Sequence, residues 1–210
     1  MLYKGVLTKM ESEFSDPINY YLSLGNDFVQ FHQLIQKKLK LKFLGFHCLN
    51  CESDSNIYRQ GFCKSCFFES PQTADWIMRP ENSKAHLGIE DRDLEYEKRV
   101  QLQPHIVYLA NSSNVKVGVT RKTQVPTRWI DQGAITALEI LEVPNRYLAG
   151  LAEVALKNYI SDKTNWREML KGNTPNVNLS DWKSKLKEYI PDELKPYILN
   201  TCLLYTSPSP

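Results

Sequence analysis

The sequence lacks any apolar run approaching the ~20 residues that a membrane-spanning helix needs. Its start, Met1-Leu2-Tyr3-Lys4-Gly5, has no charged segment followed by an apolar stretch, so we expect no secretory signal and a cytoplasmic location. Excess charge is also missing, because 26 Lys and Arg against 24 Asp and Glu give a net charge of only +2. A nucleic-acid site would therefore have to be a local basic face.

The composition is that of an ordinary globular protein, with 42% hydrophobic and 24% charged residues in a chain of 210. This length is sufficient for a sizeable core, in one large domain or two small ones. Strand-like and helix-like runs both occur, and we predict an α+β fold. The predicted regions are an N-terminal antiparallel β region (1–46), a zinc ribbon (47–69), a polar connecting segment (70–103), an α/β core (104–172), C-terminal helices (173–200) and a tail (201–210).

The tail resembles translated sequencing-adaptor sequence, from Thr201 to the closing Ser-Pro-Ser-Pro. We predict that it is non-native and leave it out of the fold, as one excludes a cloning scar. A natural disordered tail is the alternative.

Strand-forming residues mark the N-terminal region at 5–8, 18–24, 27–35 and 38–46, with turn residues at 25–27. In the last run lysines alternate with leucine or phenylalanine over residues 38–43, which is the period of a half-buried strand. The lysine stripe is then either the solvated side of that strand or a contact for phosphates.

Four of the five cysteines form two Cys-x-x-Cys pairs, Cys48 with Cys51 and Cys63 with Cys66. A two-residue gap lets both thiolates of one turn reach an ion at Zn–S distances of about 2.3 Å, and two turns complete a tetrahedron. Four protein ligands leave no position for water, so we predict a structural Zn²⁺. Disulfides are an alternative, and iron could occupy the same thiolates. His47 next to Cys48 is either a supporting group or an exposed surface residue.

From residue 104 the pattern becomes strand, strand, helix, strand, helix. We predict strands at 105–110, 115–120 and 137–143, with a turn at 111–114. Pro126 begins a short helix that ends at Gly133, and a longer helix covers 145–160. Two short helices, broken by Pro191 and Pro196, lie within 179–199. Gly118, inside an otherwise β-branched strand, indicates close approach of a ligand or another backbone.

Glu153 is the one charged residue in the apolar stretch 147–156 of the longer helix. A carboxylate on such a helix is costly unless it is paired or functional. It either pairs with Lys157 one turn later or with a neighbouring arginine, or it belongs to a catalytic type of site.

The segment 104–170 resembles the GIY-YIG nuclease fold, in which a β-hairpin, a helix, a third strand and a helix with an acidic residue follow in this order. The resemblance implies catalytic roles for Tyr108 on the first strand, Arg128 on the first helix and Glu153 on the later helix. In that family the glutamate binds a divalent cation, Mg²⁺ or Mn²⁺, that stabilises phosphodiester cleavage. Asn165 matches a further asparagine of the pattern loosely.

The segment departs from the GIY-YIG pattern at two positions. Ile106 replaces a glycine, and Lys116 replaces the second tyrosine. A solvated lysine is protonated at neutral pH, which does not suit a base, so Lys116 is a further catalytic candidate that could clamp a phosphate.

Motifs over nearly the whole chain are similar to the bacterial domain-of-unknown-function family 2797. They are Gln60-Gly61-Phe62-Cys63, Met78-Arg79-Pro80-Glu81, Val107-Tyr108-Leu109-Ala110, the run from Lys116 to Arg121, the run from Pro126 to Ala134, the run from Asn145 to Gly150 and the run from Asp162 to Arg167. This resemblance implies an architecture and no particular chemistry.

Two functional hypotheses follow. The first is a nucleic-acid-binding protein that contacts the phosphates of DNA or RNA through Lys116, Arg121, Lys122 and Arg128, with metal-dependent phosphodiester cleavage as its possible activity. The second is a non-catalytic adaptor whose zinc ribbon docks another protein. A small-molecule enzyme is a less favoured alternative to both, because no nucleotide loop or nucleophile–base pair is visible.

Overall fold

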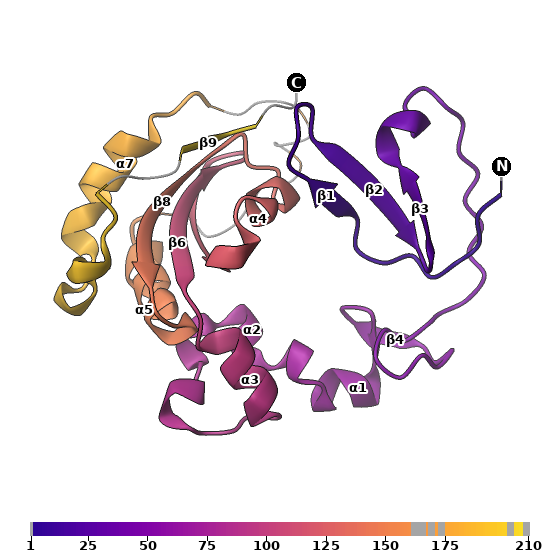
Figure 1. Cartoon of the computed structure of the whole chain (residues 1–210), viewed down its shortest axis with the longest axis horizontal. Coiled ribbons are helices and arrows are strands. Elements are labelled where there is room, and N and C mark those ends of the chain that lie inside the picture. The colour runs from indigo at the N-terminus through magenta and orange to yellow at the C-terminus, as the bar shows by residue number, and fades with distance from the viewer. Residues whose placement is uncertain (1, 161–166, 168–170, 172–174, 201–203, 208–210) are drawn as a thin grey trace. The chain divides into compact units, whose positions relative to one another are not determined.

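A computed structural model describes residues 2–160, 167, 171, 175–200 and 204–207 (Figure 1). The chain divides into two compact units, one ending at Thr73 and the other running from Ala74 to Ser207. Small antiparallel sheets and helices together confirm the predicted α+β class. Asn165, one of the expected site residues, lies outside the described residues.

A three-stranded antiparallel sheet begins the first unit, formed by β1 (Glu11–Glu13), β2 (Asn19–Leu24) and β3 (Asp27–Gln30). The predicted turn is confirmed, since Leu24 and Asp27 pair across it and Gly25 has a positive φ of 66°. A 3-10 helix, Phe31–Leu34, follows β3. The expected strand at 5–8 is reduced to one bridge between Leu7 and Leu24.

The strand predicted at 38–46 is wrong, because these residues form neither helix nor strand. Their apolar side chains are exposed like the lysines, with Leu41 87% and Phe43 72% accessible. An alternating segment forms a strand only where a neighbouring strand pairs with its backbone and a core buries its apolar face. Among the described residues this segment has no such partner.

The cysteine region follows, with a two-stranded ribbon of β4 (Ile57–Arg59) and β5 (Phe62–Cys63). Helix α1 (Lys64–Glu69) begins directly after β5, and a 3-10 helix, Pro71–Thr73, closes the unit. Phe62 is buried between the ribbon and the helix, beside Cys48 and Cys66.

The second unit contains a four-stranded antiparallel sheet in the order β7-β6-β8-β9. Its strands are β6 (His105–Asn111), β7 (Val115–Arg121), β8 (Thr136–Val143) and β9 (Leu204–Thr206). Strand β6 lies at the centre and is buried along its whole length, while β7 forms an edge. Strand β9 comes from the tail that we left out of the fold, and its Tyr205 is 4% exposed.

Side-chain alternation divides this sheet into two faces. Val107, Leu109 and Val117 face a core formed with α5 (Arg146–Lys157) and α7 (Leu179–Leu186). On the opposite face Tyr108 contacts Trp129 of α4 (Thr127–Asp131), with ring centroids 5.8 Å apart. Figure 1 shows α5 and α7 outside the curved sheet and α4 on its inner side.

Short 3-10 helices accompany α4 and α7 in this unit. A 3-10 helix, Lys122–Gln124, precedes α4, and two more, Lys187–Tyr189 and Asp192–Tyr197, follow α7. The predicted break at Pro196 is wrong, since this proline lies inside the last of them.

The segment expected to be a polar connection is mostly helical. It contains α2 (Asp75–Met78), two 3-10 helices (Pro80–Asn82 and Ala85–Leu87) and α3 (Leu94–Gln101). Its Pro80–Asn82 helix packs closely on α5 at Gly150, where an added Cβ would lie 2.2 Å from the backbone nitrogen of Glu81. This contact brings the Met78-Arg79-Pro80 stretch to the first turns of α5.

Candidate functional site

The four predicted zinc ligands converge on one point. The sulfur atoms of Cys48, Cys51, Cys63 and Cys66 all lie within 4.8 Å of one another, and those of Cys51 and Cys63 are 3.9 Å apart. Zn–S bonds of about 2.3 Å in a tetrahedron require sulfurs about 3.8 Å apart. The four thiols therefore fit a tetrahedral metal ion of the zinc type.

Hydrogen-bond donors surround these sulfurs. The backbone N–H of Cys63 donates to Cys48 Sγ at 3.3 Å, and Asn50 Nδ2 donates to Cys66 Sγ at 3.4 Å. Backbone N–H groups of Cys51 and Cys63 lower the pKa of Cys48 to about 6. Hydrogen bonds donated to sulfur stabilise the thiolate form, which is the form that binds a metal ion. These donors therefore favour metal binding at this site.

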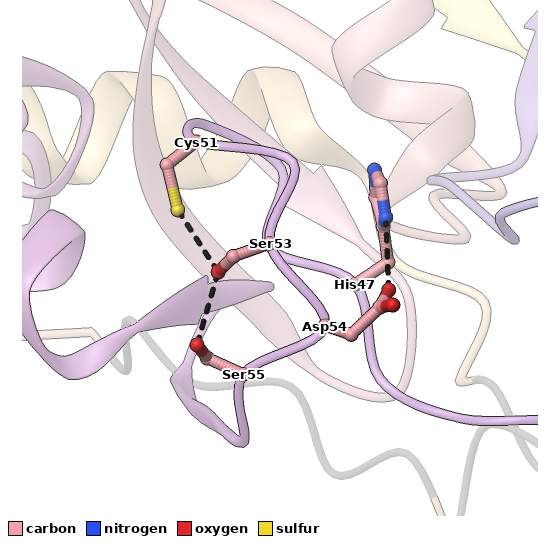
Figure 2. A network of polar contacts seen from close by, with 5 residues as sticks. All are labelled: His47, Cys51, Ser53, Asp54 and Ser55. Carbon is pink, nitrogen blue, oxygen red and sulfur yellow. Dashed lines mark hydrogen bonds and ion pairs between the residues drawn. The ribbon is translucent and has the colours of Figure 1, made fainter.

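The loop between the two cysteine pairs carries a polar network, shown in Figure 2. Ser53 Oγ lies 3.1 Å from Cys51 Sγ and donates to Ser55 Oγ at 3.0 Å. His47 Nδ1 is 3.9 Å from Asp54 Oδ1 and does not belong to the four-sulfur group. The network orders the loop around Cys51, the exposed member of the ligand set.

A cavity of about 220 Å³ lies beside the edge strand β7 of the second unit. Its lining residues include four basic residues and one acidic residue. These are Lys116, Arg128, Arg146, Lys157 and Glu153. Three of the residues predicted to be catalytic, Lys116, Arg128 and Glu153, therefore share one concavity.

Lys116 is only 5% exposed, so the expectation of a solvated lysine is wrong. Burial, together with the charge of Arg128, lowers the pKa of Lys116 to about 8. The alternation of β7 places Lys116 and Gly118 on the same face, where Gly118 also lines the cavity.

Tyr108 lies behind the cavity on the neighbouring strand. It is fully buried, and its hydroxyl donates to Oε1 of Gln132, a lining residue, at 2.9 Å. Burial raises the pKa of Tyr108 to about 12, so its phenol stays protonated near neutrality. Tyr108 pairs with Gly118, and the close approach that we expected at this glycine is made by the tyrosine ring.

Glu153 forms the ion pair with Lys157 that was one of the alternatives expected for it. Its Oε2 lies 3.6 Å from Lys157 Nζ one turn later, and its side chain is 13% exposed. The pair accounts for a carboxylate on this apolar helix, and the same side chain lines the cavity.

Arg146 is a cavity residue that the sequence did not reveal. Its Nε donates to the carbonyl of Trp76 at 3.1 Å and its Nη2 to the carbonyl of Ile77 at 2.8 Å. Its guanidinium carbon lies 5.6 Å from the Trp76 ring centroid. Burial lowers the pKa of Arg146 to about 10, and the charge of Glu153 acts against that shift. The only local signal was a basic residue following Asn145, the N-cap of α5.

The other two residues expected to contact nucleic acid are placed differently. Neither Arg121 nor Lys122 is among the cavity-lining residues. Lys122 Nζ forms an ion pair with Glu142 at 2.8 Å, which raises the pKa of Lys122. Arg121 adds a positive charge near Arg146 without joining the wall.

Comparison with known proteins identifies the family of this chain. No curated protein and no solved structure matches the chain. Within the described part of the chain, no helix combines the length and apolar character that crossing a membrane requires. The model of one family, described as "protein of unknown function (DUF2797)", matches residues 36–205, and the chain belongs to this family.

Proposed function

We propose that this protein binds nucleic acid by its phosphate groups, through the cavity beside β7, and that its four cysteines hold a structural zinc ion in the other unit. The observation that carries the proposal is the meeting of Lys116, Arg128 and Arg146 in one small concavity. Phosphate contacts supply most of the affinity of proteins for nucleic acids, and arginine is suited to them by its planar fork of donors.

The arrangement of secondary structure supports the GIY-YIG resemblance. A hairpin of β6 and β7 precedes α4, β8 pairs on the other side of β6, and α5 carries Glu153. That family cleaves phosphodiesters with a metal ion, but the cavity wall offers such an ion one carboxylate among four basic side chains. Mg²⁺ prefers carboxylate, water and phosphate oxygens, so these residues alone do not form a divalent cation site. The proposed function is therefore binding.

The test is binding of single-stranded, duplex and branched DNA and RNA at several salt concentrations. We expect affinity to fall with salt, and to fall further in Arg128→Ala than in Arg99→Ala, which removes an exposed arginine of α3. Incubation with Mg²⁺ or Mn²⁺, wild type beside Glu153→Ala, tests cleavage in the same samples. Absence of binding to any of these substrates at low salt would remove the proposal.

An adaptor function is the second candidate, and exposed aromatic residues on the ribbon favour it. Tyr58 is 45% and Phe68 55% exposed, and their ring centroids lie 5.7 Å apart. Exposed aromatic side chains of this kind are enriched at protein interfaces. Capture of a protein by the wild type in nuclease-treated lysate, and its loss in a Tyr58→Ser, Phe68→Ser variant, would support this candidate.

A further inference from the structure

We infer that the cavity beside β7 binds a phosphomonoester dianion, such as the terminal phosphate of a nucleic-acid strand, with Arg146 as its fixed anchor. This inference rests on the proposed function and names the phosphate that the cavity takes. It assigns a ligand-binding role to Arg146, which neither the family nor the sequence motifs assign.

The charge of the wall favours a dianion. Four basic side chains and one carboxylate line the cavity, which leaves a net charge of +3 when all are ionised. A phosphodiester inside a strand carries a single negative charge, whereas a terminal phosphate carries about −1.5 to −2 at pH 7 and offers three acceptor oxygens. The monoester therefore matches both the charge and the number of donors better than the diester does.

The size of the cavity points in the same direction. Proteins that follow a nucleic-acid backbone spread their basic residues along a groove and contact several phosphates. Here Lys116, Arg128 and Arg146 converge on one space of about 220 Å³. Such a space accepts one phosphate group and the adjoining part of a nucleotide, which suits the end of a strand.

Arg146 is the preorganised member of the set. Two carbonyl oxygens, of Trp76 and Ile77, accept hydrogen bonds from its Nε and Nη2, which fixes the guanidinium plane. These two bonds use two of its five N–H groups, so donors remain for an anion in the cavity that the residue lines. Because the fork is already oriented, little side-chain freedom is lost on binding.

Burial and mutual repulsion make the charged forms of the basic groups less favourable, and a bound anion would offset this. Burial, with the charge of Arg128, lowers the pKa of Lys116 to about 8, and burial also lowers the pKa of Arg146. A bound dianion would raise both values again, because an opposite charge nearby favours the protonated forms. Affinity for a phosphate should therefore be coupled to proton uptake above pH 8.

The experiment compares short oligonucleotides that differ only in a terminal phosphate, on the 5′ or the 3′ end, by fluorescence anisotropy with the full chain. We expect at least tenfold tighter binding of one phosphorylated form at pH 7.5. This preference should shrink below pH 6, where the dianion takes up a proton. Arg146→Lys should lose most of the preference, whereas Arg99→Lys on α3 should keep it, with circular dichroism confirming that both variants fold. Inorganic phosphate and a nucleoside monophosphate serve as competitors.

The outcomes separate the two proposals. Equal binding of phosphorylated and unphosphorylated strands, with an ordinary salt dependence, would overturn the terminal-phosphate inference and leave nucleic-acid binding in place. Binding of the nucleoside monophosphate without binding of any oligonucleotide would support the monoester site and remove the nucleic-acid function. Failure of every phosphate-bearing probe to bind would overturn both. The pH dependence of the wild type tests the inference even if Arg146→Lys does not fold.

Discussion

Gly118 lies directly opposite Tyr108 on the neighbouring strand, and a Cβ at position 118 would lie 2.7 Å from the tyrosine hydroxyl oxygen and 2.8 Å from Cζ. Tyr108 is fully buried and held by Gln132, so its ring has little space to move away. The glycine thus keeps the tyrosine flat against β7, beneath the wall of the cationic cavity.

Gly118→Ala should therefore destabilise the protein by about 1–3 kcal/mol, the usual cost of forcing an extra methyl group into a packed core. In a Tyr108→Leu background the same alanine should cost clearly less, because the ring atoms that it would meet are gone. Urea denaturation of the two single variants and the double variant measures the coupling. Additive changes in the free energy of unfolding would show that Gly118→Ala destabilises the protein for a reason other than contact with the tyrosine ring.

Gly150→Ala should destabilise the protein although alanine is the better helix former by about 1 kcal/mol. The new Cβ would lie 2.2 Å from the backbone nitrogen of Glu81 and 2.4 Å from the carbonyl carbon of Pro80, and neither atom belongs to a flexible side chain. We expect a lower urea midpoint and a displaced cavity wall, since this contact holds the Pro80–Asn82 helix on α5 and Pro80 lines the cavity. Ala155→Gly on the same helix is the control for propensity alone. A stabilised Gly150→Ala variant would contradict this packing.

The features that the sequence predicted correctly are set by local signals. Cysteine spacing placed four sulfurs within 4.8 Å, and turn and capping residues placed the β6–β7 hairpin and the start of α5 at Asn145. Each of these patterns needs only a few neighbouring residues to act.

The features that it missed depend on distant partners. Arg146 reaches the cavity by binding carbonyls 70 and 69 residues earlier in the chain, and nothing around position 146 encodes that. The lysine-rich alternation at 38–43 predicts a strand, but the segment pairs with no other strand among the described residues. Strand β9, in contrast, forms because it pairs with β8. Strand formation requires a partner, and a periodic pattern does not supply one.

Glu97 should be a strong determinant of stability in the segment that we expected to be a simple connection. Its carboxylate, on a residue 1% exposed, accepts hydrogen bonds from the backbone N–H groups of Asp91, Arg92 and Asp93 at 3.1, 2.8 and 3.2 Å. Glu97→Ala leaves these donors without that acceptor, and we expect a loss of about 2–4 kcal/mol.

The matched control for Glu97 is Glu95→Ala, on the same helix, where the side chain is 90% exposed and pairs with Lys98 at 3.7 Å. Its effect should stay below about 0.5 kcal/mol. Hydrogen exchange of amides 91–93 provides a second readout, because only Glu97→Ala should accelerate it. Equal effects of the two variants would show that the three hydrogen bonds contribute little.

The four-cysteine centre should carry one zinc ion per chain. Elemental analysis of purified wild type should show stoichiometric zinc, whereas Cys48→Ser and Cys66→Ser should each lose it, because both remove a buried ligand. Cys202→Ser, which changes the fifth cysteine and none of the four predicted ligands, should keep the metal. Chelation should expose four additional reactive thiols and loosen the first unit. Metal-free protein with an intact fold would contradict a structural role for the ion.

The imidazole of His105 should make the second unit sensitive to acid. His105 is fully buried, its Nδ1 lies 2.7 Å from the carbonyl oxygen of Gln103, and its Nε2 has no hydrogen-bond partner among the described residues. Burial, together with the charges of Arg146 and Arg121, lowers the pKa of His105 from 6.5 to about 4, and the hydrogen bond to Gln103 opposes this shift.

The sign of the pH dependence follows from where protons bind. The unfolded chain takes up a proton on His105 near pH 6.5, and the folded chain does so only near pH 4. The contribution to stability is therefore complete above pH 6.5 and is lost as the pH falls to 4, by up to about 3 kcal/mol. Urea midpoints measured from pH 7.5 to 4.5 should fall less steeply in His105→Gln than in wild type or in His86→Gln, which removes an exposed imidazole. The carboxylates titrate equally in all three proteins, so only the difference between their slopes of urea midpoint against pH reports on His105. Parallel profiles would mean that this histidine is protonated as easily in the folded state as in the unfolded one.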